Sequence, residues 1–144
     1  MSVSVQEADF DVGAEMDALA ADDLGAGAVA SFVGHVRGGD IFAMTLEHYP
    51  GMTEKSLQEI VATARQRWQL HRVRVIHRIG RLVPGDRIVF VGVSSSHRGD
   101  AFAACEFIMD YLKTRAPFWK KEETAAGSRW VDAREADDVA AGRW

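Results

Sequence analysis

The sequence predicts an α+β fold: a single domain over residues 1–144, with a mainly antiparallel sheet covered by two amphipathic helices and a β-hairpin toward the C-terminus. Two long segments carry apolar residues at helical spacing, one beginning near Glu54 and the other near Asp100. Short β-branched and aromatic runs lie between glycine and proline turns, as strands do. Two strands precede each long helix, an order typical of split βαβ arrangements rather than of an all-parallel sheet.

In the first half of the chain, strands and helices alternate at short intervals. Met44, Leu46 and His48 alternate with polar residues, which predicts a strand with one buried face. The following helix is predicted to be capped by Thr53, and its apolar stripe consists of Leu57, Ile60, Val61, Ala64 and Trp68. In chain order the expected elements are an edge strand at 3–5, a short helix at 11–21, strands at 28–36 and 44–49, and the helix at 54–68.

The second half repeats this order. An apolar run at 88–93 indicates a buried strand, and Asp100 is the expected N-cap of the helix after it. That helix must end before Pro117, because proline lacks an N–H group and restricts the preceding residue. The remaining expected elements are a strand at 73–79, a turn at 82–86, and a hairpin with strands at 118–122 and 129–131 and a turn at Gly127-Ser128.

Composition limits the classes of partner. The chain has 47% hydrophobic and 26% charged residues, which is ordinary for a globular domain, and its formal net charge is −4. Such a charge argues against binding nucleic acid through a broad basic face, since that mode needs many phosphate contacts. A local basic site on an acidic body suits a small anionic ligand or an acidic peptide better.

The single cysteine and the absence of a membrane signal indicate a reducing compartment. Cys105 cannot form an intramolecular disulfide, and its place on an apolar helical stripe predicts a buried core residue. No run approaches the roughly 20 apolar residues of a membrane span, and the N-terminus lacks a basic, then apolar, leader pattern. We therefore expect a cytoplasmic protein that does not bind membranes.

The histidines and serines do not form a familiar catalytic pattern. The sequence has no Cys-x-x-Cys or His-Glu-x-x-His spacing, so no metal site and no cofactor are expected. Ser94 to Ser96 lie beside His97, yet the glycine pattern of a nucleophile elbow is missing and no third residue is placed to orient a base. The other histidines are expected at strand surfaces or ends (His35, His71 and His77) or half-buried (His48).

What remains is a basic site at the two ends of the second long helix. His97 and Arg98 lie where backbone N–H groups at the helix start are free, and Lys113 lies in the last turn. Lys120 follows the proline break, beside Phe118 and Trp119, which are expected to anchor the backbone on apolar surface. Arg37 is a further candidate, from the end of another strand. From these residues alone, both an enzyme acting on a small anion and a non-catalytic binding module for a phosphorylated metabolite or an acidic tail stay open.

The chain contains several long, chemically unusual motifs, which are LEHYPGM at 46–52, IHRIG at 76–80, GDRIV at 85–89, SHR at 96–98 and FIMDYLKTRAPFWKKE at 107–122. In this order they resemble the large, catalytic subunit of molybdopterin synthase, and the similarity runs from about Gly27 to the end of the sequence. The resemblance implies an α/β-hammerhead-like fold. It also implies a homodimer that binds one small ubiquitin-like subunit at each outer end, and so a heterotetramer.

The activity that this resemblance implies is sulfur transfer in molybdenum-cofactor biosynthesis. Cyclic pyranopterin monophosphate would be converted to molybdopterin with sulfur from the thiocarboxylated Gly-Gly C-terminus of the small subunit. Lys113 and Lys120 match the two family lysines; we assign the first as general acid/base and the second as electrostatic stabiliser. No cysteine of this chain is needed, because the sulfur arrives on the partner.

The same resemblance assigns the substrate-binding residues. They are His35, Val36, Arg37, His97, Arg98, Lys113, Lys120, Lys121, Glu122 and Arg134. Arg134 matches an arginine that reaches the pocket of the partner subunit. Two features depart from the family: the loop at 38–42 is shorter, and His35 stands where some relatives have lysine. Both flank Arg37.

Overall fold

The computed structural model describes residues 2–131 and 135–144, which form two sheets and four helices. In chain order the elements are β1 (Val3–Gln6), α1 (Val12–Ala20), β2 (Ala28–His35), β3 (Ile41–His48), α2 (Met52–Arg67), β4 (Val73–Arg78), β5 (Gly80–Leu82), β6 (Arg87–Ser95), α3 (Arg98–Arg115), β7 (Phe118–Thr124), β8 (Gly127–Val131) and α4 (Glu135–Gly142).

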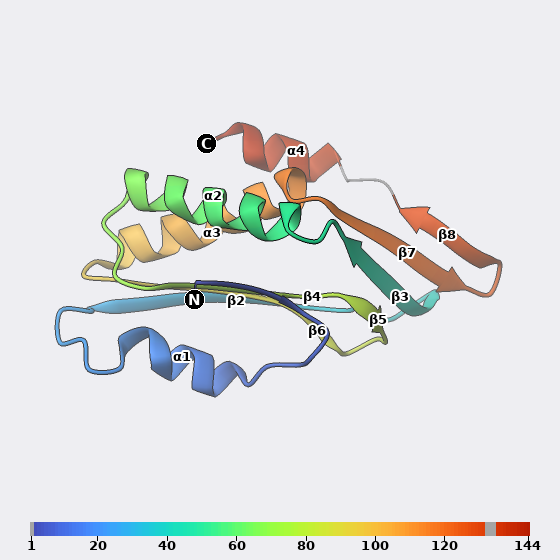
Figure 1. The fold of residues 1–144 in the computed structure, drawn as a ribbon, viewed down its shortest axis with the longest axis horizontal. Coiled ribbons are helices and arrows are strands. Elements are labelled where there is room, and N and C mark those ends of the chain that lie inside the picture. The colour runs from blue at the N-terminus through green and yellow to red at the C-terminus, as the bar shows by residue number, and fades with distance from the viewer. Residues whose placement is uncertain (1, 132–134) are drawn as a thin grey trace.

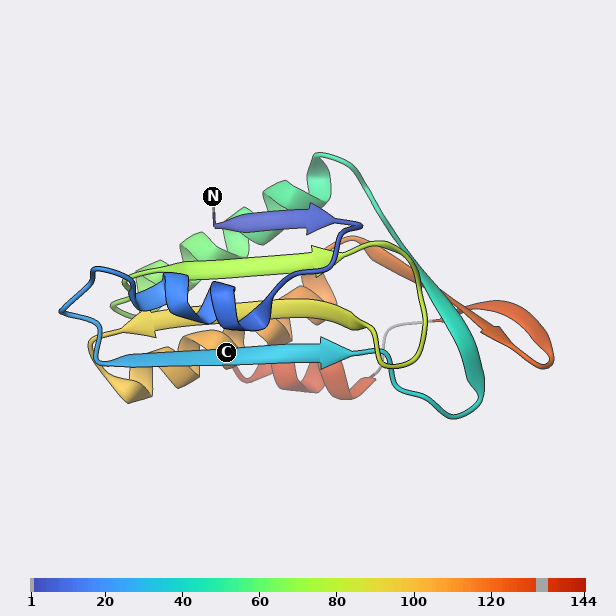
Figure 2. The same ribbon diagram turned by 90° about the horizontal axis from the view of Figure 1, so that it is seen from below.

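The first sheet is covered on both faces. Its strand order is β1-β4-β6-β2, with β1 parallel to β4 and the other pairs antiparallel. Helices α2 and α3 lie over one face and α1 over the other (Figures 1 and 2). Strand β6 is buried between these layers, which is why its sequence is apolar without alternation. On the α1 side, Phe10 and Leu19 pack with Ile76 and Phe90.

The second sheet extends from one end of the first. Its order is β5-β3-β7-β8, with every pair antiparallel. Figure 1 shows β3, β7 and β8 projecting beyond the end of the first sheet where α3 finishes. A small core joins the two sheets, made by Val36, Met44, Leu46 and Leu82. The corner between the sheets is therefore packed, and β7 starts directly from the last turn of α3.

The expected α+β class is confirmed, with several corrections to its layout. The strands divide between two sheets rather than forming one, because β3 leaves β2 and pairs with β5 and β7 instead. Strand β5 also occupies part of the segment expected to be a turn, and Ile41 and Phe42 belong to β3 rather than to a loop. The C-terminal hairpin is confirmed, but Gly127 opens β8 instead of forming the turn.

Helix α4 was not expected from the sequence, since its short segment has few apolar residues. Tertiary contacts hold its end in place. The Trp144 ring packs edge-on against Trp68 and Phe107, at centroid distances of 5.6 and 5.8 Å. Its indole N–H donates to Asp110 at 2.5 Å, and Arg143 pairs with Asp110 at 3.0 Å. These contacts place α4 against α3.

Both long helices begin at residues other than the expected caps. Helix α3 has His97 at its N-cap, three residues before the expected cap Asp100. Asp100 therefore lies in the first turn, where its carboxylate interacts favourably with the helix dipole. Helix α2 has Gly51 at its N-cap. Thr53 lies inside the first turn and is fully buried. Its buried hydroxyl has two partners: it accepts from the Tyr49 N–H at 3.0 Å and donates to the Pro117 carbonyl at 3.2 Å.

Candidate functional site

The corner between the two sheets is organised around a buried histidine. His77 is 5% exposed, which corrects the expectation of a strand-surface residue. Its imidazole stacks on Phe118 with centroids 3.8 Å apart, and its Nδ1–H donates to the Arg78 carbonyl at 2.8 Å. The pKa of His77 is lowered to about 4: burial is the main cause, the bond to the Arg78 carbonyl opposes it, and the charges of Lys113 and His48 add to the lowering. The Lys113 ammonium therefore lies close to this corner.

Lys120 lies on the same face of the second sheet as Phe118. In the register of β3 with β7, Lys120 is opposite Leu46 and Phe118 is opposite His48. Side chains two residues apart on a strand share one face, so Lys120, Phe118 and His48 point to the side where His77 is buried. Lys113, from the end of α3, comes to the same corner. The two lysines predicted to be catalytic therefore both lie on segments that adjoin the contact between Phe118 and His77.

The neighbouring residues of β7 differ in direction. Lys121 points to the opposite face from Lys120, and its ammonium lies 5.7 Å from the centre of the Trp130 ring. Glu122 shares the face of Lys120 and accepts from Arg129 at 3.3 Å. Trp119 is 48% exposed, so the expectation that it anchors the backbone is wrong and Phe118 alone does so.

The end of β2 reaches the same end of the first sheet. His35 pairs with Arg87 at the start of β6, and α3 runs back over β6, so Arg37 lies toward the end where α3 finishes (Figure 1). His35 and Arg37 are exposed. Val36 is buried, and its backbone bonds to Gly85 and Asp86, which fixes the direction of its two neighbours.

His97 and Arg98 lie at the opposite end of the molecule. Both are exposed at the start of α3, whereas Lys113 is in its last turn. Fifteen helical residues separate Arg98 from Lys113, which corresponds to roughly 22 Å along the helix axis. Within one chain, the structure therefore does not bring the expected substrate-binding pair to the lysine corner.

Arg134 lies outside the described residues, so its predicted role stays a prediction. Cys105 is buried in the core as expected; burial raises the pKa of its thiol to about 12, and the sulfur contacts the Val91 carbonyl at 3.8 Å. Such a thiol is a poor nucleophile near neutral pH.

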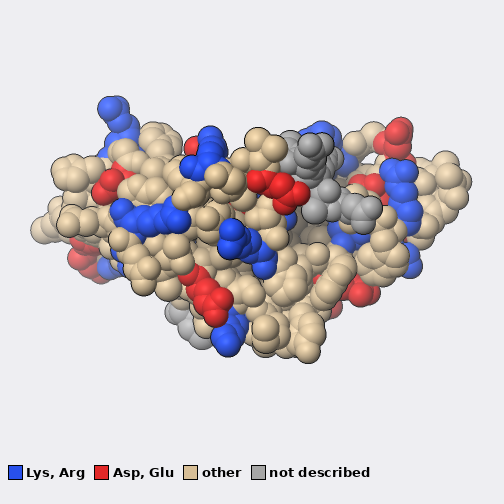
Figure 3. Space-filling view, turned by 90° about the horizontal axis from the view of Figure 1, so that it is seen from above, with Lys and Arg blue, Asp and Glu red and all other residues tan. Residues whose placement is uncertain are grey.

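The surface charges on the helical side are consistent with a local basic site rather than a broad basic face. Figure 3 shows lysine and arginine side chains interspersed with acidic ones on the helical side, without a continuous basic face. Within residues 2–131 and 135–144, no group of three or more metal-binding side chains is gathered, and no helix has the length and apolar character to cross a membrane.

Three residues of the corner were not picked out by the sequence as site residues: His48, His77 and Thr53. The only signal was that His77 interrupts an otherwise apolar run, Val75-Ile76-His77, in a strand buried on both sides. Thr53 matters because its bond to the Pro117 carbonyl ties α2 to the start of β7. These contacts hold the backbone that presents Lys120.

The arrangement defines a class of protein: an α+β domain with a lysine on each of the two segments that adjoin a packed corner between two sheets, and a His-Arg pair at the far end of a helix. The comparisons with known proteins give the family. The family described as "MoaE protein" matches residues 5–115, and the chain belongs to this family.

Individual relatives agree along the whole chain. The molybdopterin synthase catalytic subunit of Pseudomonas aeruginosa is 60% identical, over 100% of this chain and 99% of its own length. The molybdopterin biosynthesis MoaE protein of Burkholderia ambifaria has a TM-score of 0.87 at 58% identity, over 99% of this chain and 97% of that one. Molybdopterin synthase from Staphylococcus aureus has a TM-score of 0.82 at 32% identity, covering 89% and 95%.

Proposed function

We propose that this chain is the catalytic subunit of a cytoplasmic molybdopterin synthase. It takes sulfur from the thiocarboxylated C-terminus of a small ubiquitin-like subunit and transfers it to cyclic pyranopterin monophosphate. The observation that carries the proposal is the position of Lys113 and Lys120 on the two segments that adjoin the corner formed by His77 and Phe118, in a chain of the MoaE family. Both the phosphorylated substrate and the donor's C-terminal tail are anionic, and an ammonium pair attracts each of them.

The two lysines have different surroundings, which supports different tasks. Lys113 is exposed in the last turn of α3, where it can reach solvent and exchange protons during sulfur attack and departure. Lys120 is partly buried on β7 and held by the sheet, which suits electrostatic stabilisation of a charged intermediate. Arg37, from the end of β2, supplies a further positive charge at the same end for the substrate phosphate.

The separation along α3 leads us to propose that the site is shared between two copies of the chain. His97 and Arg98 lie roughly 22 Å from Lys113 along the helix axis, too far for one pterin to contact both groups within a chain. In a symmetric dimer, the α3 start of one copy can lie over the lysine corner of the other. Each substrate would then contact Lys113 and Lys120 of one copy and His97 and Arg98 of its partner.

A single-turnover assay with thiocarboxylated small subunit and cyclic pyranopterin monophosphate tests this function. Lys113→Ala and Lys120→Ala should each slow product formation, with a loss on the order of 10²–10⁴ for a residue that transfers protons. Cys105→Ala is the matched control and should react at the wild-type rate. Wild-type rates in both lysine variants would contradict the proposal.

Arginine substitutions separate catalysis from binding. Arginine keeps the positive charge but does not release a proton near neutral pH. Lys113→Arg should therefore bind substrate yet turn over slowly. Unchanged behaviour in both Lys113→Arg and Lys120→Arg would instead favour a non-catalytic module that binds a phosphorylated metabolite or an acidic tail.

A further inference from the structure

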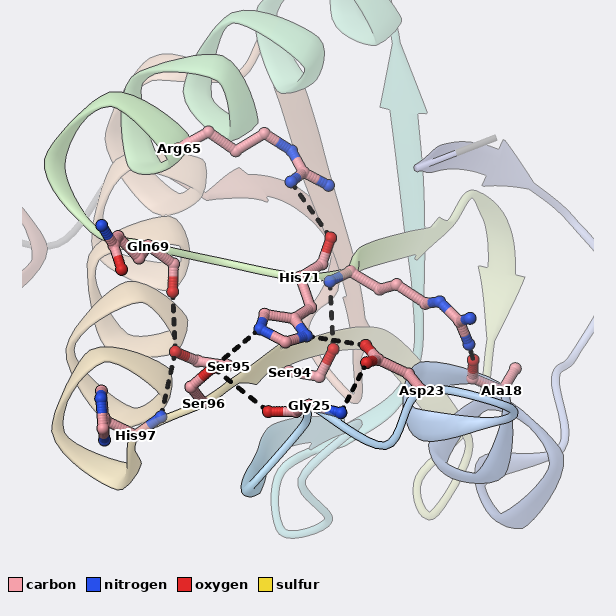
Figure 4. A network of polar contacts seen from close by, with 11 residues as sticks. Ala18, Asp23, Gly25, Arg65, Gln69, His71, Ser94, Ser95, Ser96 and His97 are labelled. Atoms are coloured by element: carbon pink, nitrogen blue, oxygen red, sulfur yellow. Dashed lines mark hydrogen bonds and ion pairs between the residues drawn. The ribbon is translucent and has the colours of Figure 1, made fainter.

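Three loops meet behind the segment that carries His97 and Arg98, and three side chains join them. Asp23 comes from the loop between α1 and β2, His71 from the loop between α2 and β4, and Ser96 from the end of β6 (Figure 4). His71 Nδ1 lies 2.7 Å from Asp23 Oδ2, and its Nε2 lies 3.0 Å from Ser96 Oγ. The His71 and Asp23 side chains are 27% and 21% exposed, so this contact is partly shielded from water.

We infer that Asp23, His71 and Ser96 form a positioning unit, here named the loop clasp, which fixes His97 and Arg98 for substrate binding. This inference rests on the proposed function. His97 directly follows Ser96, and Arg98 opens α3. A displacement of about 1 Å in a substrate-binding group can weaken a reaction by as much as 10²-fold, so a fixed loop has functional value here.

The surrounding hydrogen bonds support a positioning role. The hydroxyl of Ser95 donates to the Gln69 carbonyl at 2.7 Å and accepts from the His97 N–H at 3.4 Å. The hydroxyl of Ser94 accepts from the Arg72 N–H at 3.0 Å. Consecutive serines therefore attach the end of β6 to the loop that carries His71, and Ser96 adds the loop that carries Asp23.

The electrostatics of the clasp favour a charged Asp23. The hydrogen bond from His71 lowers the pKa of Asp23, and the charges of His71 and Arg72 and the bond from the Gly25 N–H add to that effect. An ionised carboxylate accepts more strongly than a neutral group. Asp23 thus orients the His71 ring and, through it, Ser96.

Asp23, His71 and Ser96 have the residue types of a hydrolytic triad, but the hydroxyl of Ser96 has a second partner. Ser96 Oγ lies 3.2 Å from the Gly25 carbonyl as well as 3.0 Å from His71 Nε2, so a loop backbone competes with the imidazole for its proton. In a nucleophilic serine, the base must receive this proton. The geometry fits attachment of one loop to another better than attack on a substrate.

The test measures KM and kcat for cyclic pyranopterin monophosphate in the complete synthase. Asp23→Ala and His71→Ala should raise KM about tenfold while kcat stays within about twofold, because the lysine corner is untouched. Asp23→Asn keeps an acceptor for Nδ1–H and should restore most of the lost affinity. Glu15→Ala is the matched control, because its ion pair with Arg74, at 3.3 Å, is similarly exposed, at 25% for each side chain, and joins α1 to β4 without involving Asp23, His71 or Ser96.

Hydrogen exchange of the free protein gives a second readout that does not depend on activity. The amides of residues 96–101 should exchange faster in Asp23→Ala and His71→Ala than in wild type, and at the wild-type rate in Glu15→Ala. If wild-type protein forms no molybdopterin, the proposed function fails, while the exchange result still decides whether the clasp holds the loop.

Three outcomes would overturn the loop clasp. The first is unchanged KM and unchanged exchange in the Asp23 and His71 variants. The second is a loss of kcat at constant KM. The third is hydrolysis of p-nitrophenyl acetate by wild type that Ser96→Ala abolishes, since this would assign Ser96 as a nucleophile. If an alanine variant does not fold, His71→Gln, which keeps a donor for one partner only, replaces it, and the same KM and exchange criteria apply.

Discussion

The imidazole of His77 lies almost flat against the ring of Phe118, with 3.8 Å between the centroids and 19° between the planes. This contact joins the last residues of β4 to the first residue of β7. It holds the two sheets together beside the segments that carry Lys113 and Lys120. The stacking requires an imidazole that stays buried, and burial keeps it uncharged near neutral pH.

The buried imidazole predicts acid sensitivity. In the folded chain the pKa of His77 is about 4, whereas an unfolded histidine titrates near 6.5. Between these values the unfolded chain binds more protons, so stability rises with pH and is lost as pH falls from about 6.5 toward 4. The contribution is on the order of 3 kcal/mol.

Chemical denaturation at a series of pH values checks this prediction. His77→Gln removes the titrating group, so the free energy of unfolding should depend less on pH between about 6.5 and 4 than in wild type. His35→Gln changes an exposed histidine and serves as the comparison. An equal slope in wild type and His77→Gln would show that His77 is not responsible.

A shared site predicts complementation between two inactive variants. Arg98→Ala and Lys113→Ala should each be inactive as homodimers. After subunit exchange, half of the dimers are mixed, and each mixed dimer has one intact site formed by Lys113 of one copy and Arg98 of the other. The mixture should regain about a quarter of wild-type activity.

The control is a mixture of Lys113→Ala with Lys120→Ala. Both residues lie at the same corner, so in a mixed dimer each site contains one of the two changes and no activity should return. No recovery in the Arg98→Ala and Lys113→Ala mixture, despite proven subunit exchange, would place the whole site within one chain.

A methyl group cannot replace the hydroxyl of Thr53, so we predict that removing this hydroxyl lowers the stability of the fold. Thr53→Val preserves shape but leaves the Tyr49 N–H and the Pro117 carbonyl without their partner. The free energy of unfolding should fall by about 1–3 kcal/mol. Thr53→Ser retains the hydroxyl, so its free energy of unfolding should fall by less than that of Thr53→Val. Urea denaturation of both variants measures the difference. A smaller loss in Thr53→Val than in Thr53→Ser would contradict this account.

Gly27 lets its own backbone lie close to the Ser96 carbonyl, and any larger residue at this position would block that approach. A Cβ at Gly27 would lie 2.4 Å from the Ser96 carbonyl oxygen, which is backbone and cannot rotate away. Gly27→Ala should destabilise the chain by about 1–3 kcal/mol. Gly142→Ala is the control, because a Cβ there meets nothing within 4 Å. Thermal unfolding of both variants compares the two sites, and equal stability would count against the close approach.

The sequence by itself determined the type of those elements that carry strong local signals. Helix α2 and most of α3 follow from apolar spacing, and the end of α3 follows from Pro117, because these signals are local. The burial of Cys105 followed from its place on the α3 stripe. The family motifs identified Lys113 and Lys120, because unusual residues in a long ordered run are specific without any knowledge of three-dimensional contacts.

Only the tertiary structure decided how the strands pair and which residues meet. Strand β3 alternates as any half-buried strand does, and nothing local shows that its partners are β5 and β7. His77 is buried because Phe118, far away in sequence, stacks on it. Asp23, His71 and Ser96 come from three separate loops, so their contact has no sequence spacing to reveal it. Pairing between distant segments depends on the packing of the whole chain, which local patterns do not encode.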